Sequence, residues 1–470
     1  MIDTPFDVMK FGGSSLRNVQ EILQVCQIIR SHGAPAVVVV SAMAGITDLL
    51  LNTAKAALGG HSEAIGLATE QFHARHREVI DGLIQEPAPR ESLRQALQLS
   101  TDEFGLICRS VLALDELTRK VRARIAARGE RLIARILCEI LRQSGSAVDH
   151  VDACEVIRVI PGPYDHHPDH EGCTQRARAI LLPRLQAGVT VIVPGFIAED
   201  KNGELVTLGR GGSDYSATIL GDSLGAGKVV LYKEVDGMMT ADPRFVPGAR
   251  VVSALHYREA AELAYYGAKV LHPQTIIPLI PKQIPLIVKN TFRPDLPGTR
   301  ISGEVPAQGY PVKALTAILD QVILSVEGKG MMGVPGIAAR TFAAMARGGI
   351  SVLMISQSSS ESSICFVVPT QEAGAAKELL LTEFREELSH NLLDDIRLID
   401  HAAIIAVIGL GMRGTRGIAA RTFAALARED INIEAIAQGS SELNISFAID
   451  EQQVPRALLA LHQEFQLGQT

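Results

Sequence analysis

The chain has 470 residues, 47% of them hydrophobic, which is enough for about two to four domains with packed cores. A formal net charge of −7, a pI near 6.0 and an aromatic content of 4% argue against nucleic acid and anionic membrane surfaces as partners. The six cysteines have no paired spacing, the N-terminus has no signal-peptide pattern, and no apolar run approaches the ~20 residues of a bilayer span. We therefore expect a cytoplasmic protein with reduced thiols.

The first predicted strand runs into a glycine-rich turn. Residues 8–11 are apolar apart from Lys10, and Gly12-Gly13-Ser14-Ser15 follows them. A turn from a strand into a helix leaves backbone N–H groups without partners, and the helix dipole adds partial positive charge. The segment therefore favours phosphate or carboxylate, and Lys10 adds a cation beside it.

An alternation of strands and helices follows along the chain. Residues 36–40 and 189–193 are rich in β-branched side chains, which is typical of strands buried on both faces. Between them, residues 62–145 show long helical patterns, for example at 91–99 and 132–141. This order predicts an α/β sandwich with a largely parallel sheet.

A second glycine-rich turn occupies residues 207–215. Arg210 offers a planar fork for a carboxylate, and Asp214 adds an acid beside Gly211, Gly212 and Ser213. Together with the first turn, these groups favour a small-molecule kinase site. The plainer interpretation is a capped helix start, with Ser213 or Asp214 as the N-cap, and both interpretations are compatible.

Proline and glycine cluster at 294–311, which we interpret as a boundary between two parts of the chain. An internal repeat with an offset of 81 residues follows, since 330–342 match 411–423 and 355–361 match 436–442. Residues 409–414 fit a dinucleotide-binding fingerprint, but the repeat explains this segment better. Two tandem modules of this kind suggest a pair of regulatory sites.

Several motifs, in the order of one family, resemble aspartate kinase. They are Lys10-Phe11-Gly12-Gly13-Ser14-Ser15, residues 208–215, Val235-Asp236-Gly237 and residues 262–273, and the tandem modules resemble paired ACT domains. The details are most similar to the kinase portion of bifunctional aspartate kinase–homoserine dehydrogenases. The chain ends where a dehydrogenase would begin in those proteins, so we expect either a monofunctional enzyme or a piece of a longer chain.

The resemblance implies a fold and a reaction. Residues 1–300 would form an amino-acid kinase fold, an α/β/α sandwich, followed by two ferredoxin-like βαββαβ ACT domains. The first ACT domain would comprise 313–398 with a C-terminal return at 453–470, and the second 399–452. The implied reaction transfers the γ-phosphate of ATP, with Mg²⁺ carried on the nucleotide, to the side-chain carboxylate of L-aspartate. The product, 4-phospho-L-aspartate, is the entry to lysine, threonine and methionine biosynthesis.

The resemblance also assigns site residues. Lys10 and Asp214 would be catalytic, and Gln357 and Gln438 would bind the effector. The substrate would be bound by Thr47, Glu130, Arg210, Gly211, Gly212 and Ser213. The nucleotide would be bound by Lys10, Phe11, Gly12, Gly13, Lys233, Glu234, Met239, Arg244, Lys269 and Val270. Lys233-Glu234 departs from a common Thr-Asp pair, and Met239 replaces a frequent tyrosine. No protein-only metal site is predicted, and the histidines of 166–170 are expected in a solvated loop.

Other functions stay open at this level. A kinase of the same fold acting on glutamate, acetylglutamate or a nucleotide is one alternative, and a non-catalytic ACT amino-acid sensor is another. A dehydrogenase activity would require a longer chain. We expect threonine as the effector, with lysine second, and a homodimer or homotetramer formed through the ACT domains.

Overall fold

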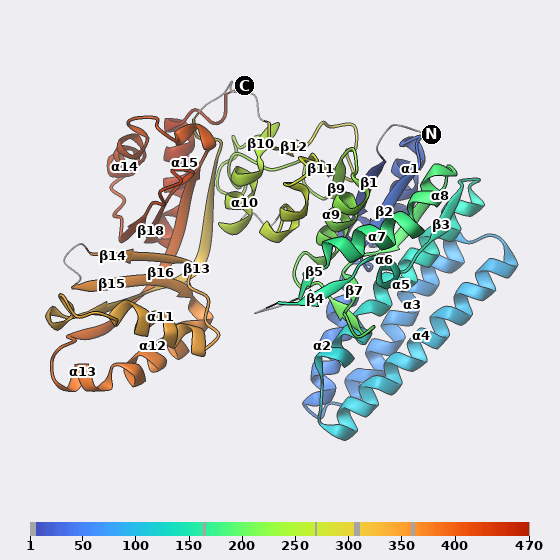
Figure 1. The fold of residues 1–470 in the computed structure, drawn as a ribbon, viewed down its shortest axis with the longest axis horizontal. Coiled ribbons are helices and arrows are strands. Elements are labelled where there is room, and N and C mark those ends of the chain that lie inside the picture. Colours follow the sequence, from blue (N-terminus) through green and yellow to red (C-terminus); the bar gives the residue numbers. More distant parts are fainter. Residues whose placement is uncertain (1–5, 163–165, 268–269, 305–310, 359–361, 470) are drawn as a thin grey trace. The chain divides into compact units, whose positions relative to one another are not determined.

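The computed structural model describes residues 6–162, 166–267, 270–304, 311–358 and 362–469 (Figure 1). They form two compact units. The first comprises Met1–Met238, Ser253–Tyr257 and Val270–Val305, and the second Met239–Val252, Arg258–Lys269 and Pro306–Thr470. The predicted boundary near residue 300 is therefore close to the main division. Two segments before residue 270, however, belong to the second unit.

The first unit is built on one eight-stranded sheet. In spatial order its strands are β10 (Ala254–His256), β12 (Thr299–Ser302), β11 (Leu286–Asn290), β9 (Val229–Lys233), β1 (Asp7–Phe11), β2 (Ala36–Val40), β6 (Thr190–Pro194) and β3 (Val148–His150). Only the pair β11 and β12 is antiparallel within this sheet. The predicted largely parallel sheet is confirmed, and its central strands β1, β2 and β9 are buried because helices cover them.

Nine helices of the described residues lie within this unit. They are α1 (Val19–Ser31), α2 (Ile46–Leu58), α3 (Glu63–Leu83), α4 (Pro87–Leu114), α5 (Arg119–Gln143), α6 (Ala153–Val156), α7 (His170–Ile180), α8 (Leu182–Gln186) and α9 (Gly212–Leu224). The long helices α3 and α4 run side by side (Figure 1). Side-chain caps from Asn18 and Thr118 set the starts of α1 and α5, since each accepts from a backbone N–H of the first turn. Among the described residues, no helix is both long and apolar enough to cross a membrane.

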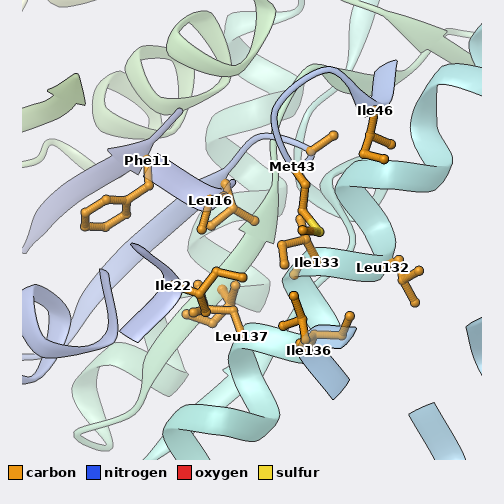
Figure 2. Packing of buried hydrophobic residues seen from close by; sticks show 14 of the residues in the cluster. Phe11, Leu16, Ile22, Met43, Ile46, Leu132, Ile133, Ile136 and Leu137 are labelled. Carbon is orange, nitrogen blue, oxygen red and sulfur yellow. The ribbon is translucent and has the colours of Figure 1, made fainter. Parts of the chain in front are cut away.

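The core that positions the site lies between the sheet and α5. Figure 2 shows Met43, just after β2, lying beside Ile133 of α5, with Ile136 and Leu137 further along the helix. Ile46, the first residue of α2, belongs to the same cluster. The segment that joins β2 to α2 is thus fixed to α5 by apolar packing.

Two small hairpins complete the first unit, β4 (Val159–Pro161) with β5 (His166–Pro168) and β7 (Ile197–Glu199) with β8 (Leu205–Thr207). The prediction of a loop at 166–170 was wrong, because residues 166–168 are a strand and His170 begins α7. His170 Nδ1 lies 3.2 Å from Asp222 Oδ2 on α9. Within the described residues, no group of three or more His, Cys, Asp or Glu side chains is arranged to hold a metal ion.

The second unit contains a six-stranded antiparallel sheet. Its strands, in spatial order, are β14 (Met354–Gln357), β15 (Ser363–Pro369), β13 (Ala314–Glu327), β16 (Asp395–Ile408), β18 (Asn444–Asp450) and β17 (Ala435–Ala437). Its helices are α11 (Ile337–Arg347), α12 (Thr370–Glu383), α13 (Arg385–Ser389), α14 (Ile418–Arg428) and α15 (Val454–Glu464), and α10 (Tyr257–Tyr265) precedes them in the chain. Equivalent elements recur at the repeat offset, as in α11 and α14, so the predicted tandem modules are confirmed.

The long strands β13 and β16 serve both modules. Each contains one residue with a positive φ, Asp320 at 58° and His401 at 59°, and the pairing register shifts near these positions. Before Asp320, β13 contributes Leu315 to the core that holds Ala403, Ile405 and Phe447. Beyond Asp320, it contributes to the other core, which contains α11 and α12.

The packing of α15 differs from the predicted division of the ACT modules. Leu458 and Leu461 lie in the same core as Leu426 of α14 and Phe447 of β18, so α15 completes the second module. The N-terminal part of β13 supplies a further strand of that module, although it precedes the other strands in the sequence. The first module is therefore inserted within the second, because two similar repeats offer α15 similar apolar faces and only the tertiary packing chooses between them.

Candidate active site

A buried ion triad lies at the carboxyl ends of the parallel strands of the first unit. Lys10 on β1 places its Nζ 2.6 Å from Asp214 Oδ1, and Lys233 at the end of β9 places its Nζ 2.5 Å from Asp214 Oδ2. Lys10 is 5% exposed and Asp214 is 4% exposed. Residues more than 200 positions apart in the sequence thus meet because β1 and β9 are neighbours in the sheet.

Two members of the triad, Asp214 and Lys10, have shifted pKa values. Burial raises the pKa of Asp214, but the charges of Lys10 and Lys233 outweigh this effect and lower that pKa to about 2. Burial is the largest influence on Lys10 and lowers its pKa to about 8, with Asp214 opposing and Lys233 adding to the decrease. At neutral pH, Asp214 is therefore ionised and Lys10 is mainly protonated.

Glycines let the backbone approach closely on both sides of the triad. A Cβ at Gly13 would lie 2.8 Å from the carbonyl oxygen of Ala42, and one at Gly12 would lie 3.2 Å from Lys10 Nζ. Gly211 has φ of 68° and precedes α9, and a Cβ there would lie 2.8 Å from the Cβ of His272. A larger side chain would therefore crowd Lys10 at position 12 and would clash with Ala42 or His272 at the other two positions.

Two helix N-termini open onto the same cavity. Gly45, with φ of 75°, precedes α2, and Gly211 precedes α9, so neither N-terminus carries a side-chain cap. Their free N–H groups and dipoles favour an anion next to Lys10 and Lys233. The residues present fit a polyphosphate, since the site combines two lysines, two helix N-termini and glycine turns.

Glu130 supplies a buried carboxylate to the same cavity. It is 3% exposed on α5, Thr47 Oγ1 donates to its Oε1 at 3.3 Å, and its Oε2 has no hydrogen-bond partner among the described residues. Burial raises its pKa to about 7. Gly129 makes this placement possible, because a Cβ there would lie 2.7 Å from the Cβ of Ala42. An unpartnered carboxylate oxygen in a cavity is suited to a cationic ligand such as an ammonium group.

These groups line one cavity of about 350 Å³. Of the predicted residues, the cavity brings together Lys10, Gly13, Thr47, Glu130, Gly211, Gly212, Ser213, Asp214 and Lys233. It also contains residues that our sequence analysis missed, namely Ser41, Met43, Asp48 and Phe196. The position of Ser41 directly after a buried strand of a parallel sheet was an available signal.

Other predicted residues lie elsewhere. Arg210 is exposed and does not line the cavity, although its charge lowers the pKa of His272 after the larger effect of burial. Phe11 is fully buried and stacks on Tyr232 with ring centroids 4.7 Å apart, so only its backbone is available to a ligand. Glu234 is exposed, and its carbonyl accepts from the Asn290 side chain at 3.1 Å.

The remaining predicted nucleotide residues divide between the two units. Val270 is half-buried in the first unit. Met239 and Arg244 belong to the second, where Arg244 is exposed and pairs with Asp242 at 2.6 Å. Lys269 lies outside the described residues.

The predicted effector residues occupy equivalent places in the two modules. Gln357 ends β14 and Gln438 follows β17, and both side chains are exposed. The strands β14 and β17 are the two edge strands of the sheet, and they also contact each other.

Comparison with known proteins identifies the families of both parts of the chain. The model of the amino acid kinase family matches residues 6–290, and a model of the ACT domain matches residues 324–384 and 405–465. A bifunctional aspartokinase/homoserine dehydrogenase of Haemophilus influenzae is 40% identical over 464 residues, which are 97% of this chain and 56% of that protein. The chain spans about half the length of the bifunctional relatives it matches.

Matches along the full length of a shorter protein also occur. Lysine-sensitive aspartokinase 3 of Escherichia coli is 31% identical over 461 residues, covering 97% of this chain and 98% of that protein. The crystal structure of E. coli aspartokinase III with aspartate and ADP has a TM-score of 0.80 at 27% identity, covering 98% of this chain and 99% of that one. The chain is thus a protein of the class in which an amino acid kinase domain is joined to ACT domains. Within that class, the chain belongs to the aspartokinase family.

Proposed function

We propose that this chain is an aspartate kinase, which transfers the γ-phosphate of ATP to the side-chain carboxylate of L-aspartate. The observation that carries the proposal is that the Lys10–Asp214–Lys233 triad and Glu130 line one cavity of about 350 Å³. The triad is suited to a polyphosphate and Glu130 to an ammonium group. A phosphate donor and an amino-acid acceptor can therefore meet in this cavity.

In this reaction an oxygen of the aspartate side chain forms a bond to the γ-phosphorus. The bond between that phosphorus and the β,γ-bridging oxygen breaks, and ADP leaves with the electron pair. Negative charge spreads over the phosphoryl oxygens in the transition state, and Lys10 and Lys233 would be the residues that stabilise it. Asp214 holds both ammonium groups in place, and its low pKa keeps it ionised throughout.

The amino-acid side is assigned by charge. Glu130 as a carboxylate would pair with the substrate ammonium, and Thr47 fixes the orientation of Glu130. Arg210 would hold the α-carboxylate through two parallel hydrogen bonds, which requires this exposed side chain to turn toward the cavity. Ser213 and the backbone of Gly211 and Gly212 would contact the reacting carboxylate.

The nucleotide would carry Mg²⁺ on its phosphates, because Asp214 is fully engaged by two lysines. Gly12, Gly13 and the backbone of Phe11 would border the phosphates. The remaining nucleotide contacts are assigned by the family resemblance alone to Glu234, Met239, Arg244, Lys269 and Val270.

The test is release of ADP from MgATP in a coupled assay, with L-aspartate, L-glutamate or N-acetylglutamate as acceptor. Turnover should require L-aspartate, and Lys10→Ala should reduce kcat at least about 100-fold. Lys55→Ala, an exposed lysine on α2, is the matched control and should retain full activity. Folded protein without aspartate-dependent turnover would reject the proposal and favour an amino-acid sensor.

We further propose that threonine, with lysine second, inhibits the enzyme at Gln357 and Gln438, in a homodimer or homotetramer assembled through the ACT modules in the cytoplasm. These amides can both donate to and accept from a small amino acid. Support comes from their equivalent positions in the repeat, at the ends of two edge strands that contact each other. The assignment would be supported if threonine inhibits the parent protein and Gln438→Ala removes this inhibition. Equal inhibition of the parent and of Gln438→Ala would oppose it.

A further inference from the structure

A second groove lies in the first unit, beside α4 and α5. Its volume is about 570 Å³, and it is lined by four arginines of α5, Arg124, Arg128, Arg131 and Arg135. Their spacing of four, three and four residues places all four side chains on one face of the helix. None of them takes part in the function proposed above.

The acidic side chains of this groove are already engaged. Glu103 accepts from Arg128 Nη1 at 3.0 Å, Asp152 accepts from Arg131 Nε at 2.7 Å, and Glu155 accepts from the backbone N–H of Asp152 at 3.1 Å. Each carboxylate thus has a protein partner.

Positive groups remain after this pairing. Arg124 and Arg135 are exposed, and in the described part of the chain neither has a carboxylate within 4.0 Å. Since four guanidinium groups face three carboxylates, the groove carries a local excess of positive charge.

Two residues that line the groove each carry a buried nitrogen atom with no hydrogen-bond partner among the described residues. Arg128 is 9% exposed, and its Nε finds no acceptor among the described residues. The same holds for Nε2 of His150, which lies at the end of β3 and also lines the groove. A buried guanidinium N–H without an acceptor is costly, so a ligand that supplies acceptor oxygens would be stabilised here.

We propose that this arginine groove binds a phosphate group, either free phosphate or the phosphate of a small metabolite. The fork of each guanidinium matches the oxygens of a phosphate, which offers more acceptors and more charge than a carboxylate does. Arg124 and Arg135 supply the unpaired charge, and Arg128 supplies the buried donor.

The groove lies against the helix that carries Glu130. Gly129 and Glu130 sit between Arg128 and Arg131 in the sequence, and Gly129 packs against Ala42 of the other cavity. Phosphate binding would thus bias the position of α5 and alter the KM for aspartate. This consequence rests on the proposed function, whereas the binding itself does not.

Isothermal titration of the full chain with inorganic phosphate and, separately, with pyrophosphate tests the site. The double variant Arg124→Gln/Arg135→Gln should weaken binding about tenfold or more, because charge-assisted hydrogen bonds are lost. Arg122→Gln is the matched control, an exposed arginine of α5 that does not line the groove. It should bind like the parent protein.

The candidate active site also attracts anions, so Lys10→Ala separates the two sites. Saturable binding that survives Lys10→Ala and weakens in the double variant supports the arginine groove. The proposal is overturned if neither anion binds saturably, if the double variant binds like the parent, or if Arg122→Gln has the same effect as the double variant. It is also overturned if Lys10→Ala alone abolishes binding.

Discussion

Replacing Glu130 by glutamine should stabilise the protein and impair aspartate binding at the same time. In the folded chain, burial raises the pKa of Glu130 from 4.5 to about 7, whereas the unfolded chain keeps the ordinary value. The folded state therefore holds the proton more tightly, and the stability contributed by protonated Glu130 is lost as the pH rises from about 4.5 to 7. Glutamine does not ionise, so the variant does not lose this stability as the pH rises.

The size of the effect follows from the pKa. A difference of about 2.5 pH units, at about 1.4 kcal/mol per unit, corresponds to a cost of about 3 kcal/mol for ionised Glu130. Between pH 5 and 8, the unfolding free energy of Glu130→Gln should therefore rise relative to the parent by about 2–3 kcal/mol. The Thr47 hydrogen bond can be kept by the amide oxygen, and any constant cost of the amide cancels in this pH comparison.

The chain has no tryptophan, so urea unfolding is best followed by circular dichroism at several pH values. Glu70→Gln, an exposed carboxylate on α3, is the control and should follow the parent at every pH. In the coupled assay at pH 8, Glu130→Gln should raise the KM for aspartate about 10- to 100-fold, because an ionic hydrogen bond is lost. Parallel stability curves for Glu130→Gln and the parent from pH 5 to 8 would refute the argument.

Three further outcomes are expected. Gly129→Ala should destabilise the chain by about 1–3 kcal/mol in thermal unfolding, because the added Cβ would clash with the segment after β2. The control is Gly66→Ala in α3, which should be neutral or stabilising because the space around Gly66 is open. Lys233→Met should lower kcat about 100-fold. It should also move the alkaline limb of the pH profile of kcat/KM toward higher pH, because we assign this limb to Lys10 near pH 8 and the charge of Lys233 helps to lower the pKa of Lys10. An alkaline limb at the same pH in the variant and the parent would contradict the assignment. Gln438→Ala should raise the threonine concentration needed for half-inhibition about tenfold or more, and unchanged sensitivity would place the effector elsewhere.

Much of the first unit was predictable because local signals agreed there. Runs of β-branched residues marked β2 and β6, helical periodicity marked α4 and α5, and both glycine turns stand where strands give way to helical backbone. Lys10 and Asp214 were predicted as site residues from the glycine turns, and the structure places both beside one cavity. The role of Lys233 as the second partner of Asp214 was not predicted, since that contact depends on the neighbouring positions of β1 and β9 in the sheet.

Burial separated Phe11 and Glu130, which were both predicted as binding residues. Phe11 and Glu130 are both fixed in the interior, but one stacks in the core and the other opens onto the cavity. The exposure of Arg210 could not be predicted from the sequence either, because a long side chain beside a positive-φ glycine has no local constraint on its direction.

The amino-acid sequence by itself determined the class of the protein, the two glycine-rich turns and the tandem modules, because these depend on periodicity, turn chemistry and repetition along the chain. Only the tertiary structure decided which half of each long strand serves which module and where α15 packs. It also brought Lys10, Asp214 and Lys233 into one buried triad and gave Glu130 its raised pKa. The physical reason is that long-range contacts and desolvation depend on which segments become neighbours in space, and a sequence encodes that choice only through the packing of the whole unit.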